Sequence, residues 1–177
     1  MKNPKGFAWE DPKLQFPSGS EHLVMPRTVF FSVFMGNILR SYLYAPLTLE
    51  SMRRNHMIDF VLINLINNKT SEEEAELLEW RTKLGVENFH VHVLTLESFR
   101  DVVKDRLGIE IAITSAWSYK LCDFKPTLAF LFPQYTSEAV YSYWAFGDID
   151  VVWGNVSRFA YLFQDPVKFP VVITAWW

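Results

Sequence analysis

The chain has 177 residues, of which 50% are hydrophobic and 16% aromatic, so it is long and apolar enough to form one domain with a sizeable core. Its formal net charge of −3 gives no reason to expect nucleic acid as a partner, because phosphate backbones attract basic surfaces. The single cysteine, Cys122, excludes an internal disulfide. No apolar run approaches the roughly 18 residues of a membrane helix. We therefore predict a cytoplasmic protein, at most peripheral to a membrane, with no membrane span.

The first third of the chain predicts a leader, a strand and a helix. Residues 1–25 contain prolines and little periodicity, so they are predicted to form an irregular leader. The continuous β-branched and aromatic run over residues 27–36 predicts a strand buried on both faces, as in a parallel sheet. Pro46 marks the start of a helix that ends near Asn55.

A second strand and a second helix follow. Residues 58–65 form another continuous apolar run and are predicted to be a buried strand. The next helix begins at a capping box and ends at Gly85, where glycine is favoured because the backbone turns left-handed. The capping box consists of Thr70 or Ser71 followed by Glu73 or Glu74.

A third pair of elements has a different strand pattern. Residues 89–94 alternate between apolar and polar side chains, which predicts a strand that is half exposed or near the edge of the sheet. Thr95 is expected to cap a helix that ends before Gly108. The side chains expected to share its apolar face are Phe99, Val102, Val103 and Leu107.

This alternation of strands and helices predicts an α/β layered, Rossmann-like fold with a mostly parallel central sheet flanked by helices. Residues 171–174 read as one more buried strand, after which the sequence stops at two tryptophans. We therefore expect residues 26–177 to form one domain that is incomplete at its C-terminus.

Two carboxylates interrupt an apolar run at residues 143–155, which read YWAFGDIDVVWGN. Asp148 and Asp150 are separated by one isoleucine, and side chains at i and i+2 of an extended segment point to the same side. Burying unpaired carboxylates is costly unless a cation neutralises them. The pattern therefore predicts a divalent metal ion that carries a phosphate group, at the carboxyl end of a late strand, where open α/β sheets bind ligands.

A segment just upstream adds charged side chains to an apolar stretch that otherwise reads as helix. Lys120, Asp123 and Lys125 lie within SYKLCDFKPTLAFLFP, residues 118–133. Lysines near a carboxylate pair fit a site where phosphate charge is balanced. The alternative is a surface helix on which Lys120 and Asp123 form an i, i+3 pair.

The two blocks YKLCDFKP (119–126) and YSYWAFGDIDVVWGNVSRF (141–159) resemble a family of capsular-polysaccharide-type glycosyltransferases. In that family a YKLCDFKP block precedes FWG-CDIDIIFGDIRKF, and an N-P-x-x-DF motif lies upstream, which corresponds here to RRNHMIDF (53–60). The resemblance covers residues 27–174. It implies a GT-A-like fold, a nucleotide-sugar donor, a manganese or magnesium ion, and transfer of the sugar to a glycan or another hydroxyl acceptor in polysaccharide synthesis.

The resemblance also implies which residues form the donor site. Asp148 and Asp150 are the metal-binding D-x-D pair, and Asp148 also meets the donor. The other residues expected to bind the donor are Phe34, Gly36, Asn64, Lys120, Asp123 and Lys125. Asn64 stands where relatives usually have the aspartate of an FTD motif, so it offers a hydrogen bond without a charge. Gly147 stands where they usually have a cysteine or another small residue. No catalytic base is assigned.

Three other interpretations remain open. The same D-x-D could serve a haloacid-dehalogenase-type phosphatase, with Asp148 as nucleophile and Asp150 as acid and base. The domain could instead be a truncated or degenerate one that binds a nucleotide sugar without turnover. His90 and His92 share a strand face and could bind a metal, but without a third ligand nearby a polar strand face is the favoured interpretation.

Overall fold

The computed structural model describes residues 23–66 and 71–163. The chain divides into two compact units, of which one is Pro26–Val156 and the other combines Met1–Met25 with Ser157–Trp177. All candidate donor-site residues lie in the first unit. Most of the expected leader, the capping-box side chains and the expected strand at residues 171–174 lie outside the described residues.

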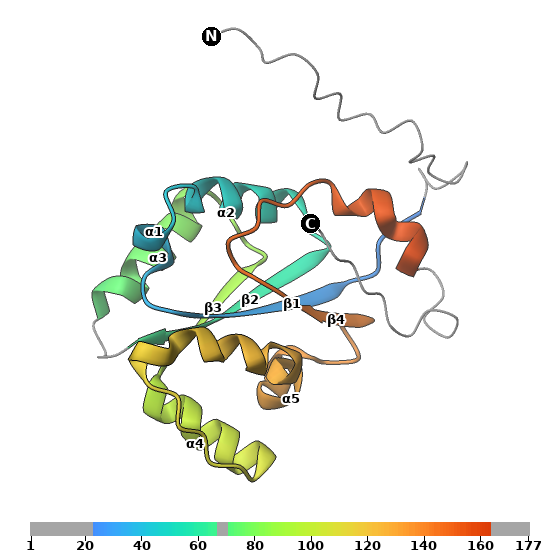
Figure 1. The fold of residues 1–177 in the computed structure, drawn as a ribbon. Coiled ribbons are helices and arrows are strands. Elements are labelled where there is room, and N and C mark those ends of the chain that lie inside the picture. The colour runs from blue at the N-terminus through green and yellow to red at the C-terminus, as the bar shows by residue number, and fades with distance from the viewer. Residues whose placement is uncertain (1–22, 67–70, 164–177) are drawn as a thin grey trace, which may run out of the picture. The chain divides into compact units, whose positions relative to one another are not determined.

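Four parallel strands form one sheet in the order β3-β2-β1-β4 (Figure 1). The strands are β1 (Thr28–Met35), β2 (Ile58–Ile66), β3 (Phe89–Thr95) and β4 (Tyr143–Phe146). Strand β2 is buried along its whole length, whereas β3, at one edge, is mostly half-buried. Central strands thus correspond to the continuous apolar runs and the edge strand to the alternating run. The predicted α/β layered fold with a parallel sheet is confirmed.

One face of the sheet is covered by α4 (Leu96–Leu107), the 3₁₀ segment η2 (Ser115–Thr127) and α5 (Leu128–Leu131). Alternate residues of β1 and β2 point into this layer and form its core with side chains of the helices. The members include Val29, Phe31, Val33, Val61, Ile63, Leu65, Phe99, Val103, Leu121 and Leu128. The predicted apolar face of α4 is therefore confirmed.

The helices α1 (Ile38–Ser41), α2 (Ala45–Arg54) and α3 (Ser71–Lys83) lie on the opposite side from α4 and α5 (Figure 1). On this face Phe30 and Phe60 pack against Trp153, with ring centroids 4.8 and 5.2 Å from the indole. Trp153 in turn donates its backbone N–H to Ser51 Oγ of α2, at 2.9 Å. The segment after β4 therefore bridges the sheet and α2.

Helix boundaries follow the local chemistry that the sequence predicts. Helix α2 has a proline in its first turn and ends at Arg54, with Asn55 as its C-cap. Thr95 Oγ1 accepts the Ser98 N–H at 3.1 Å and caps α4, and Gly108 ends it with φ +70°. Gly85 likewise has a positive φ, of +61°. The segment at residues 118–133 is largely helical as expected, but mostly 3₁₀, in η2 (Ser115–Thr127), with the short helix α5 (Leu128–Leu131) after it.

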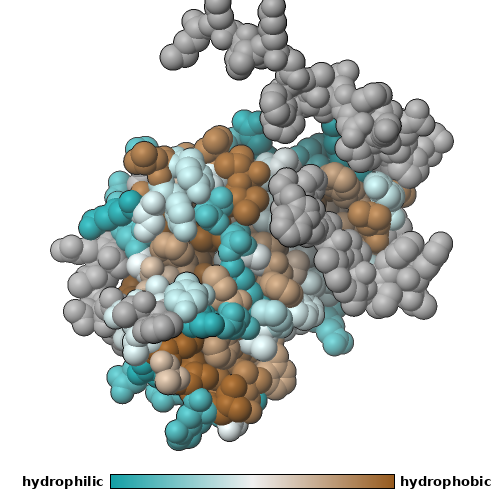
Figure 2. Space-filling view, in the orientation of Figure 1, coloured by the Kyte–Doolittle hydropathy of each residue, from teal (hydrophilic) through white to brown (hydrophobic). Residues whose placement is uncertain are grey.

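The remaining described elements are the 3₁₀ helices η3 (Pro133–Tyr135) and η4 (Val156–Phe163). Within the described residues, no helix is both long enough and apolar enough to cross a membrane. On the face drawn in Figure 2, apolar residues gather at the lower end, over α4 and α5. The exposed large apolar side chains include Phe130 of α5 and Ile109, just after α4.

Candidate donor site

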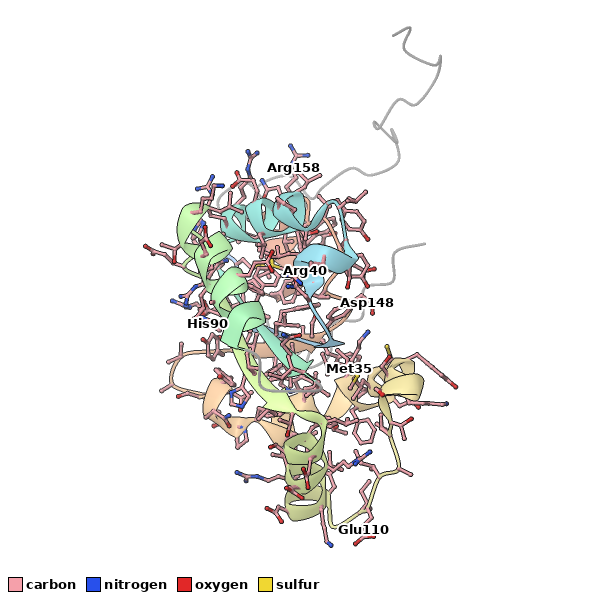
Figure 3. All side chains as sticks on the ribbon, turned by 90° about the vertical axis from the view of Figure 1, so that its left-hand side faces the viewer. Met35, Arg40, His90, Glu110, Asp148 and Arg158 are labelled. Atoms are coloured by element: carbon pink, nitrogen blue, oxygen red, sulfur yellow. The ribbon has the colours of Figure 1, made fainter. Side chains whose placement is uncertain are left out.

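The site is defined by the strand order. The chain moves from β1 to β2 and β3 on one side, and then returns to place β4 on the other side of β1. The direction of winding therefore reverses between β1 and β4, and open α/β sheets bind ligands at the carboxyl ends of the strands at such a point. Asp148 follows β4 by two residues. In Figure 3 it lies on the same side of the molecule as Met35, the last residue of β1, and Arg40 of α1.

Gly147 holds the start of the D-x-D loop close against strand β1. Its N–H donates to Phe31 O at 3.1 Å, and its carbonyl accepts the Ser32 hydroxyl at 2.9 Å. A Cβ atom at this position would lie 2.7 Å from Cζ of Phe30. The backbone can therefore approach β1 this closely only because residue 147 is glycine.

The D-x-D segment is not the extended strand that the spacing predicted. Strand β4 ends at Phe146, and the backbone bends at Ile149 and Asp150. Ile149 is buried, Asp150 is half-buried, and the Asp148 side chain is 65% exposed. The carboxylates thus avoid the desolvation expected for an apolar run, because the strand has already ended and only the isoleucine turns into the core.

Lys125 of η2 pairs directly with Asp148. Its ammonium donates to Asp148 Oδ1, although the lysine itself is only 8% exposed. Burial lowers the pKa of Lys125, but the hydrogen bond and the charge of Asp148, together with Cys122, outweigh it and raise the pKa. Lys125 is therefore a charged group fixed beside the first aspartate.

Lys120 and Asp123, from the same block, form the i, i+3 pair that the alternative interpretation predicted. Lys120 Nζ lies 3.6 Å from Asp123 Oδ2, and both side chains are largely exposed. The Lys120 ammonium also lies 5.3 Å from the centre of the Tyr119 ring. Of the three charged residues in this block, Lys125 is the one that the structure shows in contact with the D-x-D segment.

Tyr42, just after α1, brings an aromatic side chain to the carboxylates. Burial, and after it the charges of Asp150, Tyr44 and Asp148, raise the pKa of Tyr42, while the Lys125 ammonium lowers it. The phenol follows β1 and the aspartates follow β4, and these strands are parallel neighbours, so all three side chains lie at the same end of the sheet. Tyr42 also stacks in a tilted geometry between Phe34 and Tyr44, with centroid distances of 5.6 Å to each.

The remaining expected donor-site residues lie at the ends of β1 and β2. Phe34 is partly exposed and reaches the site through Tyr42. Gly36 has φ +107° and donates its N–H to Leu65 O at 2.9 Å, which turns the chain out of β1. Asn64 is 0% exposed and pairs in register with Phe34. Among the described residues neither polar atom of its side chain has a hydrogen-bond partner.

The segment after the aspartates is tied to the end of α2. Asn55 Nδ2 donates to Gly154 O at 2.9 Å, and Asn55 Oδ1 accepts the Val156 N–H at 3.0 Å. Together with the contact of Trp153 to Ser51, these bonds hold the segment at its far end. The loop that carries Asp148 and Asp150 is therefore anchored on β1 at one end and on α2 at the other.

The two histidines of β3 have partners other than a metal. His92 Nδ1 lies 2.9 Å from the Tyr135 hydroxyl, and burial lowers the pKa of His92. His90 Nε2 lies 3.7 Å from Asp59, which also pairs with Arg27 before the start of β1. This second cluster lies at the amino ends of the strands, away from the D-x-D segment. Within the described residues, no group of three or more histidine, cysteine or acidic side chains is arranged to bind a metal.

Tyr42, Ser32 and Asn55 were missed from the sequence. Ser32 lies inside an apolar strand run, Asn55 ends a helix, and Tyr42 lies in a turn, so each has an ordinary local explanation. The strand order is what brings them to the D-x-D segment. The sequence position of Tyr42 could have indicated its role, because the turn after the first strand of an open α/β sheet borders the ligand crevice.

The sheet and its switch-point loop define a Rossmann-like α/β protein with two carboxylates, a lysine and aromatic side chains at the usual ligand position. The chain matches the family described as "Family of unknown function (DUF6625)" over residues 30–164 and belongs to that family. The match includes every residue of the candidate site. No curated protein and no solved structure matches the chain.

Proposed function

We propose that this domain is the donor-binding part of a GT-A-type glycosyltransferase. It binds a nucleotide-diphosphate sugar through a divalent cation at Asp148 and Asp150 and transfers the sugar to an acceptor hydroxyl. The observation that carries the proposal is the position of these aspartates at the switch point of a parallel sheet, beside a buried lysine. The resemblance of residues 119–126 and 141–159 to capsular-polysaccharide glycosyltransferases supports the same function.

The donor set fits a hard cation that arrives with its substrate. Mg²⁺ usually keeps several waters and is bound through one or two carboxylates plus substrate phosphates, without a closed protein cage. Two neighbouring aspartates, with no third metal ligand grouped beside them in the described residues, match that pattern. Manganese or magnesium is therefore the proposed cofactor, and a structural zinc site does not fit.

Different side chains of this chain would bind different parts of the donor and its cation. Asp148 and Asp150 hold the cation, which stabilises charge on the leaving diphosphate as a Lewis acid. Lys125 supplies a further positive charge at the same place. Tyr42 and Tyr44 present aromatic rings on which a base or a sugar can stack. In the reaction, the bond from the anomeric carbon to the diphosphate oxygen breaks, the acceptor oxygen forms the new bond, and the hydroxyl proton passes to a base that we do not assign.

The test uses the full chain with UDP-sugars and GDP-sugars, with and without Mn²⁺. We expect calorimetry to show Mn²⁺-dependent binding of one of these donors and a chromatographic assay to show slow hydrolysis of its sugar. Asp150→Ala should weaken binding at least about tenfold, because a hydrogen-bonded or coordinated charge is lost. The control is Asp105→Ala, which removes an exposed aspartate from α4.

Each outcome has a distinct meaning. Unchanged Mn²⁺-dependent binding and hydrolysis in Asp150→Ala would refute the assignment of the site. Metal-dependent binding without hydrolysis, and without transfer to any acceptor, would favour the non-catalytic nucleotide-sugar-binding domain over the enzyme.

A further inference from the structure

Lys125 occupies the carboxylate on which the proposed cation depends. Its ammonium bonds to Asp148 Oδ1 and also interacts with Cys122. In the described part of the chain, Asp148 is the carboxylate with which Lys125 forms an ion pair. A divalent cation that binds Asp148 must therefore displace this ammonium or share the carboxylate with it.

The burial of Lys125 separates this pair from an ordinary surface ion pair. The Lys125 side chain is 10% exposed, whereas in the Lys104–Glu110 pair the two side chains are 61% and 81% exposed. Exposed pairs exchange freely with water and contribute little. Burial removes most of the water around the Lys125 ammonium, so losing its charged partner would be costly, even though Asp148 itself is 65% exposed.

The formal charges show what happens when a cation arrives. The Asp148 and Asp150 carboxylates and the Lys125 ammonium together carry a formal charge of −1. A divalent cation alone changes this to +1, which leaves Lys125 beside a like charge and without its partner. A cation that brings a diphosphate of charge −2 returns the sum to −1 and gives the ammonium phosphate oxygens to bind. The lysine thus opposes the cation alone and favours the cation together with the diphosphate.

We propose that Lys125 takes the place of the cation at Asp148 in the free protein and transfers its charge to the donor diphosphate on binding. The consequence is positive coupling: the cation and the diphosphate each bind weakly alone and tightly together. This inference rests on the proposed function, because it requires the cation at Asp148 and Asp150. It adds that Lys125 couples the binding of the cation to the binding of the diphosphate and suppresses occupation of the site by free cations.

The experiment measures Mn²⁺ binding to the full chain by electron paramagnetic resonance, first alone and then with inorganic pyrophosphate. Lys125→Met keeps the length and volume of the buried side chain and removes its charge. We expect this variant to bind Mn²⁺ alone about five- to tenfold more tightly, since a nearby like charge at a partly exposed site has an effect of this order. The Mn²⁺-loaded variant should bind pyrophosphate about tenfold more weakly than the loaded wild type, because a charge-assisted hydrogen bond is lost.

Two variants serve as controls. Lys104→Met removes a lysine from an exposed ion pair on α4 and should change neither affinity. Lys125→Arg keeps the positive charge and should bind Mn²⁺ alone more weakly than Lys125→Met does, because a like charge remains beside the cation. If Lys125→Met does not fold, Lys125→Gln replaces it with the same expected signs.

The outcomes separate this inference from the proposed function. If Lys125→Met leaves the affinity for Mn²⁺ alone unchanged or weakens it, the lysine does not hold the place of the cation. If it tightens Mn²⁺ binding but pyrophosphate affinity does not fall, the transfer of charge to the diphosphate is refuted. If Asp150→Ala binds Mn²⁺ as well as wild type does, the proposed function fails together with the inference.

Discussion

Gly147→Ala tests how the D-x-D loop is positioned. The added Cβ would lie 2.7, 3.3 and 3.8 Å from three carbon atoms of the Phe30 ring. That ring cannot move aside easily, because it packs edge-on against Trp153 at 4.8 Å and tilted against Phe60 at 5.8 Å. The backbone at residue 147 is also held by its hydrogen bonds to Phe31 and Ser32.

We expect Gly147→Ala to lower the free energy of unfolding by about 1–3 kcal/mol, the usual effect of forcing an extra carbon into a packed core. For a chain of this size, that corresponds to a fall in Tm of about 3–10 °C. The strain should be relieved by moving residue 147 away from β1, which also moves Asp148. In the proposed function, Mn²⁺ affinity should therefore fall as well.

The assay is urea unfolding followed by tryptophan fluorescence and circular dichroism, with Gly154→Ala as the matched control. A Cβ at Gly154 has no atom within 4 Å, and Gly154 lies in the same loop. Gly154→Ala should therefore remain close to wild type in stability. Equal stabilities of the two alanine variants would refute the reasoning that close approach to Phe30 requires glycine at position 147.

Two further predictions concern buried polar side chains. Asp59→Asn should lower the free energy of unfolding by about 2 kcal/mol at pH 6. Burial raises the pKa of Asp59, but hydrogen bonds from His90, Arg27 and Tyr141 outweigh this effect and lower the pKa to about 2. Because the pKa of Asp59 is lower in the folded protein than in the unfolded one, this stabilisation is lost as the pH falls from about 4 towards 2. Urea unfolding at pH 6, 4 and 3 measures the loss. A difference between wild type and Asp59→Asn that does not change with pH would contradict the prediction. Asn64→Leu should raise the free energy of unfolding by about 1–2 kcal/mol, because an unpaired buried amide is replaced by an apolar group of similar volume. Loss of nucleotide-sugar binding in this more stable variant would support the donor-site role of Asn64, whereas a less stable variant would show that the amide has a partner.

The sequence by itself determined the elements and their class. The continuous runs at residues 27–36 and 58–65 predicted strands buried on both faces. The alternating run at residues 89–94 predicted a strand that is half exposed or near an edge. Both predictions were possible because the number of buried faces sets the side-chain pattern of a strand directly. Thr95 and Gly108 marked the ends of α4 for reasons that are equally local. The interruption of an apolar run singled out Asp148 and Asp150 as candidate metal ligands, whereas nothing local in the sequence separated Lys125 from Lys120 and Asp123.

The tertiary structure decided which of these residues meet. Lys125 pairs with Asp148 across 23 residues of sequence, while Lys120 and Asp123 pair with each other on the surface. Tyr42, after β1, and the aspartates, after β4, lie at the same end of neighbouring strands because β4 lies beside β1 and not beside β3. No local pattern encodes that order. Strand order arises from the packing of whole layers, in which residues distant in sequence bury each other's apolar faces. A site at the switch point is therefore a property of the assembled sheet.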